Sequence, residues 1–261
     1  MFVRQLLKTQ LHLKFLSKMS RPLLVAFDFD HTIVDDNTDI VVRKLLPEEK
    51  LPDSVRGLYR SDGWTAYMRK IFELLHANGI SLSQIDTAIQ NILPVAGIET
   101  LLHKLHDSNC EIIIISDSNS LLISTWLKHK KLDNLIAQVF TNPAWANENG
   151  MMCIDMYHVQ DWCKLSTKNL CKGHILEEYI KKRFEDGVQF EKIMYVGDGR
   201  NDLCPILRLS ENDIAFPRKE YALIKILNDP QSEKGQSVKA QVYPWNNATD
   251  ILHEIIQKVN L

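Results

Sequence analysis

Four short apolar segments, separated by stretches with helical patterning, constrain the fold of this chain most strongly. They lie at Leu23–Phe29, Ile112–Ser116, Lys192–Asp198 and Asp213–Phe216. The first segment, LLVAFDF, is apolar throughout its strand-like part, as expected of a strand buried on both faces. The amphipathic spacing before the second segment, and the helical stretches 173–185 and 202–209, indicate βα alternation. The pattern therefore predicts an α/β fold with a parallel sheet covered by helices on both faces.

A long insertion interrupts this alternation after the first strand. Residues 39–93 show helical patterning, with turn signals at Pro47, Pro52, Gly79 and Pro94. We predict a core formed by 21–38 and 94–261, a small helical cap over 39–93, and an N-terminal extension over 1–20. The cap carries Trp64, Tyr67 and Met68 at helical spacing, and these side chains are expected to form the cap's own small core rather than to line its entrance.

Composition narrows the partners and the compartment. The chain has 261 residues, of which 45% are hydrophobic, and a formal net charge of −2, so its overall charge predicts binding neither to nucleic acid nor to a membrane surface. No apolar run approaches the ~18 residues of a membrane span. Five irregularly spaced cysteines argue against a disulfide framework and a zinc site, and they favour the cytoplasm. Residues 1–27 contain basic but no acidic side chains, which leaves mitochondrial targeting as an alternative.

Polar side chains gather at the carboxyl ends of three predicted strands. Because parallel strands end at the same edge of a sheet, these residues are expected to face one crevice. They are Asp28, Asp30 and Thr32 in DFDHT, Ser116 and Asp117 after the second strand, and Asp198 with Asp202 in GDGRND. Several carboxylates in one site repel one another unless a cation offsets their charge, and oxygen ligands favour Mg²⁺. The sequence therefore predicts a magnesium site beside a bound phosphate.

These residues suit phosphoryl transfer. Asp28 is predicted to attack phosphorus and form an aspartyl-phosphate, while Asp30 protonates the leaving oxygen and later deprotonates the hydrolytic water. Lys172, at the start of a helix, is expected to stabilise the phosphoryl oxygens, with hydroxyl donors from Ser116 and Thr32. Each feature alone is equally typical of a turn, a helix cap or a surface lysine. Their occurrence in order at successive strand ends makes the combined pattern specific.

The same motifs resemble those of the haloacid-dehalogenase superfamily. They are DxDxT at Asp28–Thr32, Ser116, Lys172 and GDGxxD at Gly197–Asp202. The segments DFDHTIVDDNTD, IISDSNS, FTNPA, KNLCKG, YVGDGRNDLCP and AFPRK further resemble the phosphoethanolamine/phosphocholine phosphatase family, and its pyridoxal-phosphate phosphatase branch in particular. The resemblance extends from Pro22 to Ile255.

The resemblance implies a Rossmann-like core with a helical cap and a magnesium-dependent phosphatase. By matching positions, Asp28, Asp198 and the backbone carbonyl of Asp30 would be metal ligands, with Asp202 supporting that ligand shell. The family's substrate-contacting aspartates fall on Asp39 and Asp117. The resemblance favours pyridoxal 5′-phosphate as the small phosphomonoester, with phosphoethanolamine and phosphocholine as alternatives. His31, where relatives are expected to carry Glu or Asn, is assigned no catalytic role.

Three other functions use parts of the same pattern. A dehalogenase shares the nucleophile but has no leaving oxygen to protonate, so Asp30 favours phosphate chemistry. A non-catalytic phosphate-binding module predicts damaged motifs, whereas Asp28, Asp30, Lys172 and Asp198 are all present. A phosphotransferase would use the same residues, and the sequence does not separate it from a hydrolase. The oligomeric state is likewise left open.

Overall fold

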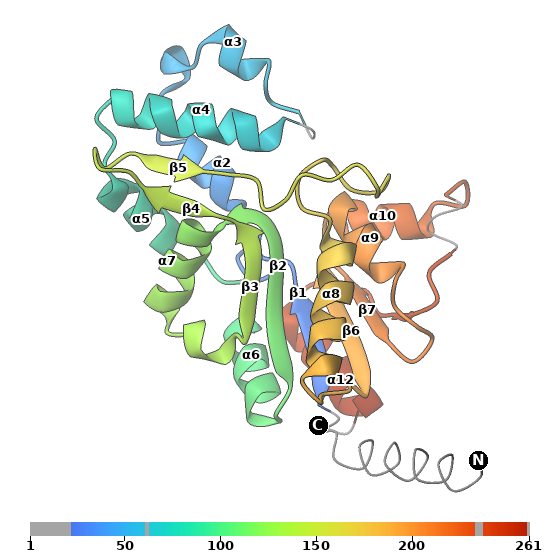
Figure 1. Cartoon of the computed structure of the whole chain (residues 1–261). Coiled ribbons are helices and arrows are strands. Elements are labelled where there is room, and N and C mark those ends of the chain that lie inside the picture. Colours follow the sequence, from blue (N-terminus) through green and yellow to red (C-terminus); the bar gives the residue numbers. More distant parts are fainter. Residues whose placement is uncertain (1–21, 61–62, 233–236, 260–261) are drawn as a thin grey trace, which may run out of the picture.

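A six-stranded parallel sheet forms the centre of the molecule. The computed structural model describes residues 22–60, 63–232 and 237–259. The strand order is β3-β2-β1-β6-β7-β8, and every neighbouring pair is parallel (Figure 1). The strands are β1 (Leu23–Phe27), β2 (Glu111–Asn119), β3 (Gln138–Asn142), β6 (Lys192–Gly197), β7 (Ile214–Pro217) and β8 (Gln241–Val242). This arrangement confirms the predicted α/β class with a parallel sheet.

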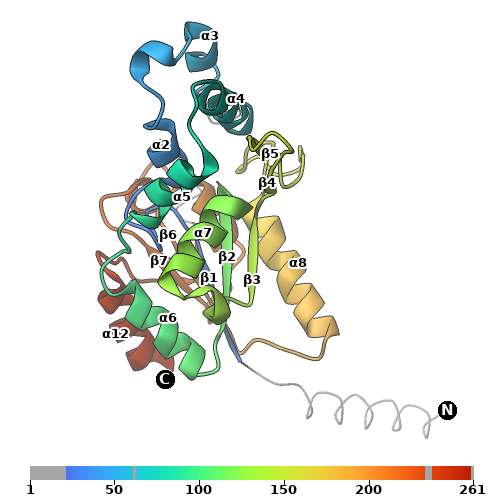
Figure 2. The same ribbon diagram turned by 90° about the vertical axis from the view of Figure 1, so that its left-hand side faces the viewer.

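Helices cover both faces of this sheet. In β1, Val25 and Phe27 point into one core cluster, whereas Leu24 and Ala26 point into the other, so both faces of the strand are buried. The first cluster includes residues of α6 (Ile98–Asp107), α7 (Ser120–Lys130) and α12 (Ala248–Val259) (Figure 2). The second includes residues of α8 (Lys172–Glu185), α9 (Leu203–Ile206) and α10 (Ala222–Asn228) (Figure 1). The alternating burial explains why the sequence of β1 is apolar without interruption.

Residues 39–93 form helices at one end of the sheet, as Figure 1 shows. They include most of α2 (Thr38–Arg43), η1 (Glu48–Lys50), α3 (Asp53–Arg56), α4 (Trp64–Ala77) and α5 (Leu82–Gln90). Helix α5 packs against the core helix α7, and α4 packs against β5. The helical content of the insertion was predicted, while its treatment as a separate cap domain stays a prediction. The proposed N-terminal extension, 1–20, lies outside the described residues.

An antiparallel hairpin next to α4 was not predicted. It consists of β4 (Ala144–Ala146) and β5 (Met152–Ile154), joined by a short turn. Arg69 on α4 donates to the carbonyl of Ile154 and forms an ion pair of 2.9 Å with Asp155. The strands of this hairpin have only three residues each, too few for a period-two pattern to be recognised in the sequence. The hairpin therefore links the core to α4 through the contacts of Arg69.

One helix expected from the sequence is shorter than predicted. The stretch 202–209, expected as one helix, is instead a 3₁₀ turn, η3 (Arg200–Asp202), followed by the short α9. Pro205 lies within α9 and lacks a backbone N–H, which is tolerated in a first turn but not deep inside a helix. Residues 133–135 form a further 3₁₀ turn, η2 (Asp133–Leu135).

In the described part of the chain, no helix is long and apolar enough to cross a membrane.

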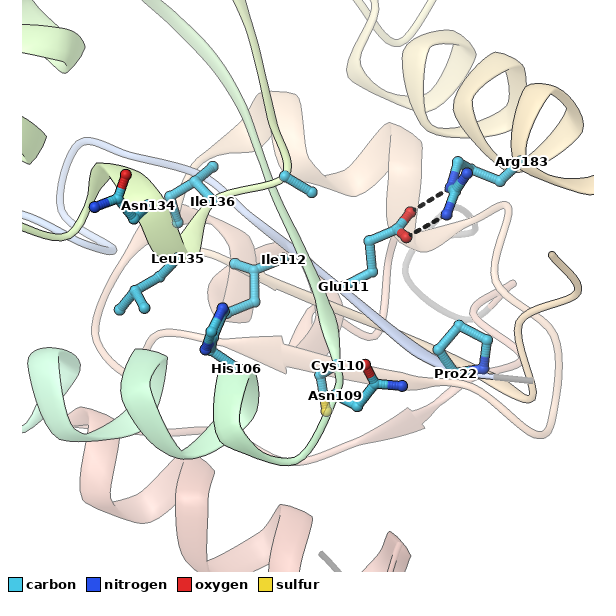
Figure 3. Close-up of a pocket in the computed structure, with 11 residues that line it drawn as sticks. Pro22, His106, Asn109, Cys110, Glu111, Ile112, Asn134, Leu135, Ile136 and Arg183 are labelled. Carbon is cyan, nitrogen blue, oxygen red and sulfur yellow. Dashed lines mark hydrogen bonds and ion pairs between the residues drawn. The ribbon is translucent and has the colours of Figure 1, made fainter. Parts of the chain in front are cut away.

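A hollow of about 400 Å³ lies at the end of the sheet opposite the predicted site (Figure 3). It is bordered by Pro22 before β1 and by Glu111 at the start of β2. Arg183 forms a bidentate ion pair with Glu111, with both N–O distances 2.8 Å, as the dashed lines in Figure 3 mark. None of the predicted site residues borders this hollow, so it does not belong to the predicted crevice.

We predict that Leu102→Ala lowers the free energy of unfolding by about 2–5 kcal/mol, because Leu102 is fully buried on α6 and its truncation leaves a cavity. Urea titration followed by circular dichroism measures the change. Thr100→Ala, at an exposed position of the same helix, is the matched control and should shift stability by less than about 0.5 kcal/mol. Equal effects of the two substitutions would contradict the described packing of α6.

Candidate active site

A buried lysine joins two carboxylates at the carboxyl end of β1. The Nζ of Lys172 lies 2.6 Å from Oδ2 of Asp28 and 2.7 Å from Oδ1 of Asp202, and Lys172 is fully buried. Asp28 directly follows β1, while Lys172 begins α8 and Asp202 ends η3. Burial opposes the charge on Lys172, but the two carboxylates outweigh it and raise the pKa of the ammonium group. The lysine therefore stays protonated, and it is a buried residue rather than a surface one.

Asp202 is held by donors on all sides. Its Oδ1 accepts from Lys172 and from the Tyr195 hydroxyl, both at 2.7 Å, and its Oδ2 accepts the backbone N–H groups of Asp198 and Gly199. A Cβ added at Gly197 would lie 2.5 Å from the Asp202 carboxylate, so that position needs glycine. With both oxygens occupied, Asp202 fixes the positions of Lys172 and of the backbone at Asp198 and Gly199, while its supporting role at a metal stays a prediction.

Asp28 and Asp198 remain able to accept a cation. The carboxylate oxygens of Asp28, Asp198 and Asp202 lie within 4.8 Å of one another, and all three residues are buried. Burial raises the pKa of Asp28, and Lys172 only partly opposes this; burial and the charge of Asp202 raise the pKa of Asp198 to about 7. Three carboxylates lie near one lysine, so the site has an excess of negative charge that a divalent cation would offset. The residues therefore fit a hard, oxygen-preferring ion such as Mg²⁺.

Asp30 lies in a separate hydrogen-bonded group on the same loop. Its Oδ1 accepts from the backbone N–H of Thr38 at 3.0 Å, and its Oδ2 accepts from the Thr38 hydroxyl at 3.2 Å. That hydroxyl also lies 2.7 Å from the hydroxyl of Ser118. Burial, reinforced by the charge of Asp39, raises the pKa of Asp30 well above its ordinary value. Asp30 thus retains a proton to higher pH than an exposed carboxyl, as a proton donor requires.

The two predicted hydroxyl donors are buried on neighbouring parts of the fold, with Thr32 on the loop after β1 and Ser116 within β2. Thr32 donates to Oδ1 of Asp198 at 3.4 Å, which brings it into the carboxylate group. Ser116 lies within β2, and its Oγ accepts the backbone N–H of Ser118 at 3.2 Å. The alternative that Ser116 caps a helix is wrong, because Asn119 is the N-cap of α7. Ser116 and Asp117 do not follow the second strand as predicted, because β2 continues to Asn119. The role of the two hydroxyls as donors stays a prediction.

The two candidate substrate contacts lie on different elements, Asp39 on α2 and Asp117 on β2. Asp39 is buried, and its Oδ2 accepts from Nε1 of Trp64 at 2.6 Å, while its Oδ1 is buried without a hydrogen-bond partner. Burial raises the pKa of Asp39 to about 7. Asp117 is exposed, and its Oδ2 accepts from Nδ2 of Asn201 at 3.2 Å. Trp64 and Asp117 both line a cavity of about 410 Å³ between α4 and the strand ends.

The expectation for the aromatic residues of the cap is therefore only partly correct. Tyr67 and Met68 are buried in the core cluster that includes α4. Trp64 instead lines the cavity, because its indole N–H is held by Asp39. Helical spacing alone does not distinguish these residues, since the direction of the Trp64 side chain depends on a partner 25 positions earlier in the sequence.

Arg218 organises the loop after Asp30 and was not identified from the sequence. Its guanidinium donates to the carbonyl of His31 and to the carboxylate of Asp35, each at 2.6 Å. It also lies over the rings of Tyr221 and Trp245, 4.6 and 5.1 Å from their centroids. His31 has a positive φ of 54°, which is uncommon for a residue other than glycine. The motif AFPRK contains this arginine, but only the fold shows that it reaches the first loop.

The fold and this strand-end site together define a phosphatase of the haloacid-dehalogenase type. The family model described as "Putative Phosphatase" matches residues 23–259. The chain is 35% identical to human pyridoxal phosphate phosphatase PHOSPHO2, covering 89% of this chain and 97% of the relative. It is 33% identical to human phosphoethanolamine/phosphocholine phosphatase, covering 87% and 86%. The protein therefore belongs to this phosphatase family.

Solved structures agree with the fold. A structure titled "Phospho-Aspartyl Intermediate Analogue of Phosphoserine phosphatase" has a TM-score of 0.59 at 19% identity, covering 90% of this chain and 99% of the other. Apo phosphoserine phosphatase has a TM-score of 0.56, also at 19% identity, covering 90% and 98%. At this level of identity the similarity concerns the fold, and it confirms the predicted Rossmann-like architecture.

We predict that Asp39→Asn stabilises the protein at alkaline pH. Because the pKa of Asp39 is about 7 in the fold against an ordinary value of 3.8, its ionisation destabilises the fold as pH rises from about 4 to 7. The variant lacks this ionisation, so it should match the wild type at pH 4 and exceed it at pH 8 by about 1–4 kcal/mol. Urea unfolding with EDTA at both pH values measures this.

Asp53→Asn, at an exposed carboxylate of the cap region, is the control for that experiment. It should change stability little at either pH. A stability difference between Asp39→Asn and wild type that is the same at pH 4 and pH 8 would contradict the buried, proton-retaining state of Asp39.

Proposed function

We propose that this phosphatase hydrolyses a small phosphomonoester through an aspartyl-phosphate on Asp28, with Mg²⁺ held by Asp28, Asp198 and the backbone carbonyl of Asp30. The observation that carries the proposal is the ion pair of Lys172 with Asp28 beside Asp198. Lys172 partly opposes the rise in the pKa of Asp28 that burial causes, and it orients the carboxylate that acts as the nucleophile. Pyridoxal 5′-phosphate is the proposed substrate.

The chain's own residues account for the two half-reactions. Asp28 attacks phosphorus in line with the leaving oxygen, and Asp30 donates its proton to that oxygen. Asp30 then takes a proton from the water that attacks the aspartyl-phosphate, which restores its protonated form and frees phosphate. Lys172, Ser116 and Thr32 stabilise the charge on the phosphoryl oxygens through preorganised donors. A bound Mg²⁺ would neutralise phosphate charge and so allow the anionic Asp28 to approach.

The cavity under the cap supports a small substrate. Its volume of about 410 Å³ is within the range of small-molecule sites, and its wall includes Trp64, Thr65 and Asn169. An indole at this position offers a flat apolar surface for the ring of pyridoxal 5′-phosphate. The similarity to human pyridoxal phosphate phosphatase favours the same substrate.

A second candidate substrate class is phosphoethanolamine or phosphocholine. The exposed Asp117 and the indole of Trp64 line the cavity, while the buried Asp39 lies behind that indole and accepts its N–H. An aromatic face with nearby carboxylates also suits an ammonium or trimethylammonium group. The comparable similarity to phosphoethanolamine/phosphocholine phosphatase is consistent with this candidate.

We predict that phosphate release requires both Mg²⁺ and Asp28. Release from pyridoxal 5′-phosphate, phosphoethanolamine and phosphocholine should be measured with Mg²⁺ and with EDTA. Asp28→Asn should reduce kcat by at least about a thousandfold, because the amide is not a nucleophile for phosphorus. Asp36→Asn, on the same loop but outside the carboxylate group, is the control and should keep activity. Turnover that survives in Asp28→Asn would contradict the proposed nucleophile, and the ratio of kcat/KM values ranks the substrates.

We predict that the effect of Asp30→Asn on kcat depends on the leaving group of the substrate. For pyridoxal 5′-phosphate, whose alcohol needs a proton, kcat should fall by roughly 10²–10⁴-fold. With p-nitrophenyl phosphate, whose leaving group needs none, formation of the aspartyl-phosphate should persist while its hydrolysis slows. A rapid-quench experiment should then show a burst of nitrophenolate close to the enzyme concentration. Equal losses for both substrates without a burst would sink the acid–base assignment of Asp30.

A further inference from the structure

Three cysteine thiols meet beside the candidate active site although they are distant in the sequence. Cys163 lies in the loop between β5 and α8, Cys171 directly precedes α8, and Cys204 lies in α9. The Sγ of Cys204 is 3.5 Å from that of Cys163 and 3.7 Å from that of Cys171. All three sulfur atoms lie within 4.8 Å of one another. No function assigned above uses these thiols.

The separations between the sulfur atoms suit a soft metal ion. Zn²⁺ binds thiolates at about 2.3 Å in tetrahedral geometry, which places neighbouring sulfurs about 3.8 Å apart. We propose that Cys163, Cys171 and Cys204 form a thiolate site that binds Zn²⁺. The absence of a CxxC pair argued against zinc from the sequence, but the fold assembles the ligands from three separate segments.

The surroundings of the thiols supply a place for a fourth ligand. The Ser166 hydroxyl oxygen is buried without a hydrogen-bond partner and lies beside Cys163 and Cys204. It completes the coordination directly or by holding a water. Cys163 is only partly buried, so an ion reaches the site from solvent.

A positively charged side chain lies beside the thiols. The guanidinium of Arg208 lies 3.8 Å from the Sγ of Cys204 and would offset the net negative charge of three thiolates around Zn²⁺.

Hydrogen bonds from the side chain of Gln160 hold the backbone of the loop that carries Cys163. Gln160 is buried; its Oε1 accepts the backbone N–H of Cys163 at 2.7 Å, and its Nε2 donates to the carbonyls of Cys163 and Thr167. Thr167 and Asn169 of the same loop line the cavity under α4. A metal bound at the thiols would therefore fix a wall of that cavity to α9 and to the start of α8. This site is independent of the proposed phosphatase mechanism.

The test measures Zn²⁺ binding directly. Full-length protein, reduced and freed of metal with a chelator, is dialysed into excess Mg²⁺ so that hard carboxylate sites are filled, and is then titrated with Zn²⁺ against a chromophoric chelator. We expect one Zn²⁺ per chain and, with Co²⁺ as the probe, a thiolate-to-metal charge-transfer band. Cys163→Ser should lose both signals. Cys153→Ser, which changes a half-buried thiol outside the cluster, is the matched control and should keep them.

Three outcomes would overturn the proposal. The first is wild-type protein that fails to bind Zn²⁺ more tightly than the competing chelator. The second is the same affinity and spectrum in Cys163→Ser and in Cys163→Ala, with circular dichroism showing both folded. The third is a Cys163–Cys204 disulfide that mass spectrometry finds in protein kept under reductant, since that result would identify the thiols as a redox pair.

Discussion

The ion pairs of the buried Lys172 ammonium with Asp28 and Asp202 are the interaction on which the rest of the site depends. A lysine without solvent contact is costly to bury unless its charge is matched, and removal of one partner from such a group typically costs about 3–5 kcal/mol. Because α8, β1 and η3 each contribute one of the three charged groups, their relative positions are tied together. The same lysine lowers the pKa of Asp28 and so partly opposes the rise that burial causes.

The sheet order explains why the catalytic groups are adjacent. Strands β1 and β6 are neighbours, with Phe27 opposite Val196, and the Asp28 N–H donates to the Val196 carbonyl at 2.9 Å. The residues that follow these strands, Asp28 and Asp198, therefore emerge side by side. Gly197 lets Asp202 fold back under this strand end, where it accepts backbone N–H groups. Strand order and turn geometry thus bring several negative charges together. This concentration of negative charge favours a divalent cation at the strand ends.

Much of this arrangement could be predicted from the sequence, because strand ends and their polar residues are local features. The apolar run of β1 and the motif around Asp198 were enough to expect a parallel sheet with carboxylates at one edge. The helical insertion was also predictable from its periodicity. The burial of Lys172 was not, since a lone lysine at a helix start is more often exposed, and only the fold shows the carboxylates on either side of it.

Contacts between distant segments were the features that the sequence did not reveal. The indole of Trp64 turns to Asp39 of another helix, and Arg218 reaches back to the carbonyl of His31, 187 positions away. The thiols of Cys163 and Cys204, 41 positions apart, were likewise invisible to a search for short metal-binding spacings. In each case the tertiary packing brings the two partners together, so a local sequence pattern does not predict the contact.

A phosphoryl group carried by Asp28 during turnover can be trapped chemically. The most direct measurement is to quench the enzyme with denaturant during steady-state hydrolysis, reduce it with borohydride and map the peptides by mass spectrometry. An acyl phosphate is reduced to an alcohol, so we expect conversion of Asp28 to homoserine, dependent on both substrate and Mg²⁺. Homoserine in place of Asp30 or Asp198 instead, or no homoserine in enzyme quenched while it releases phosphate, would show that Asp28 is not the nucleophile.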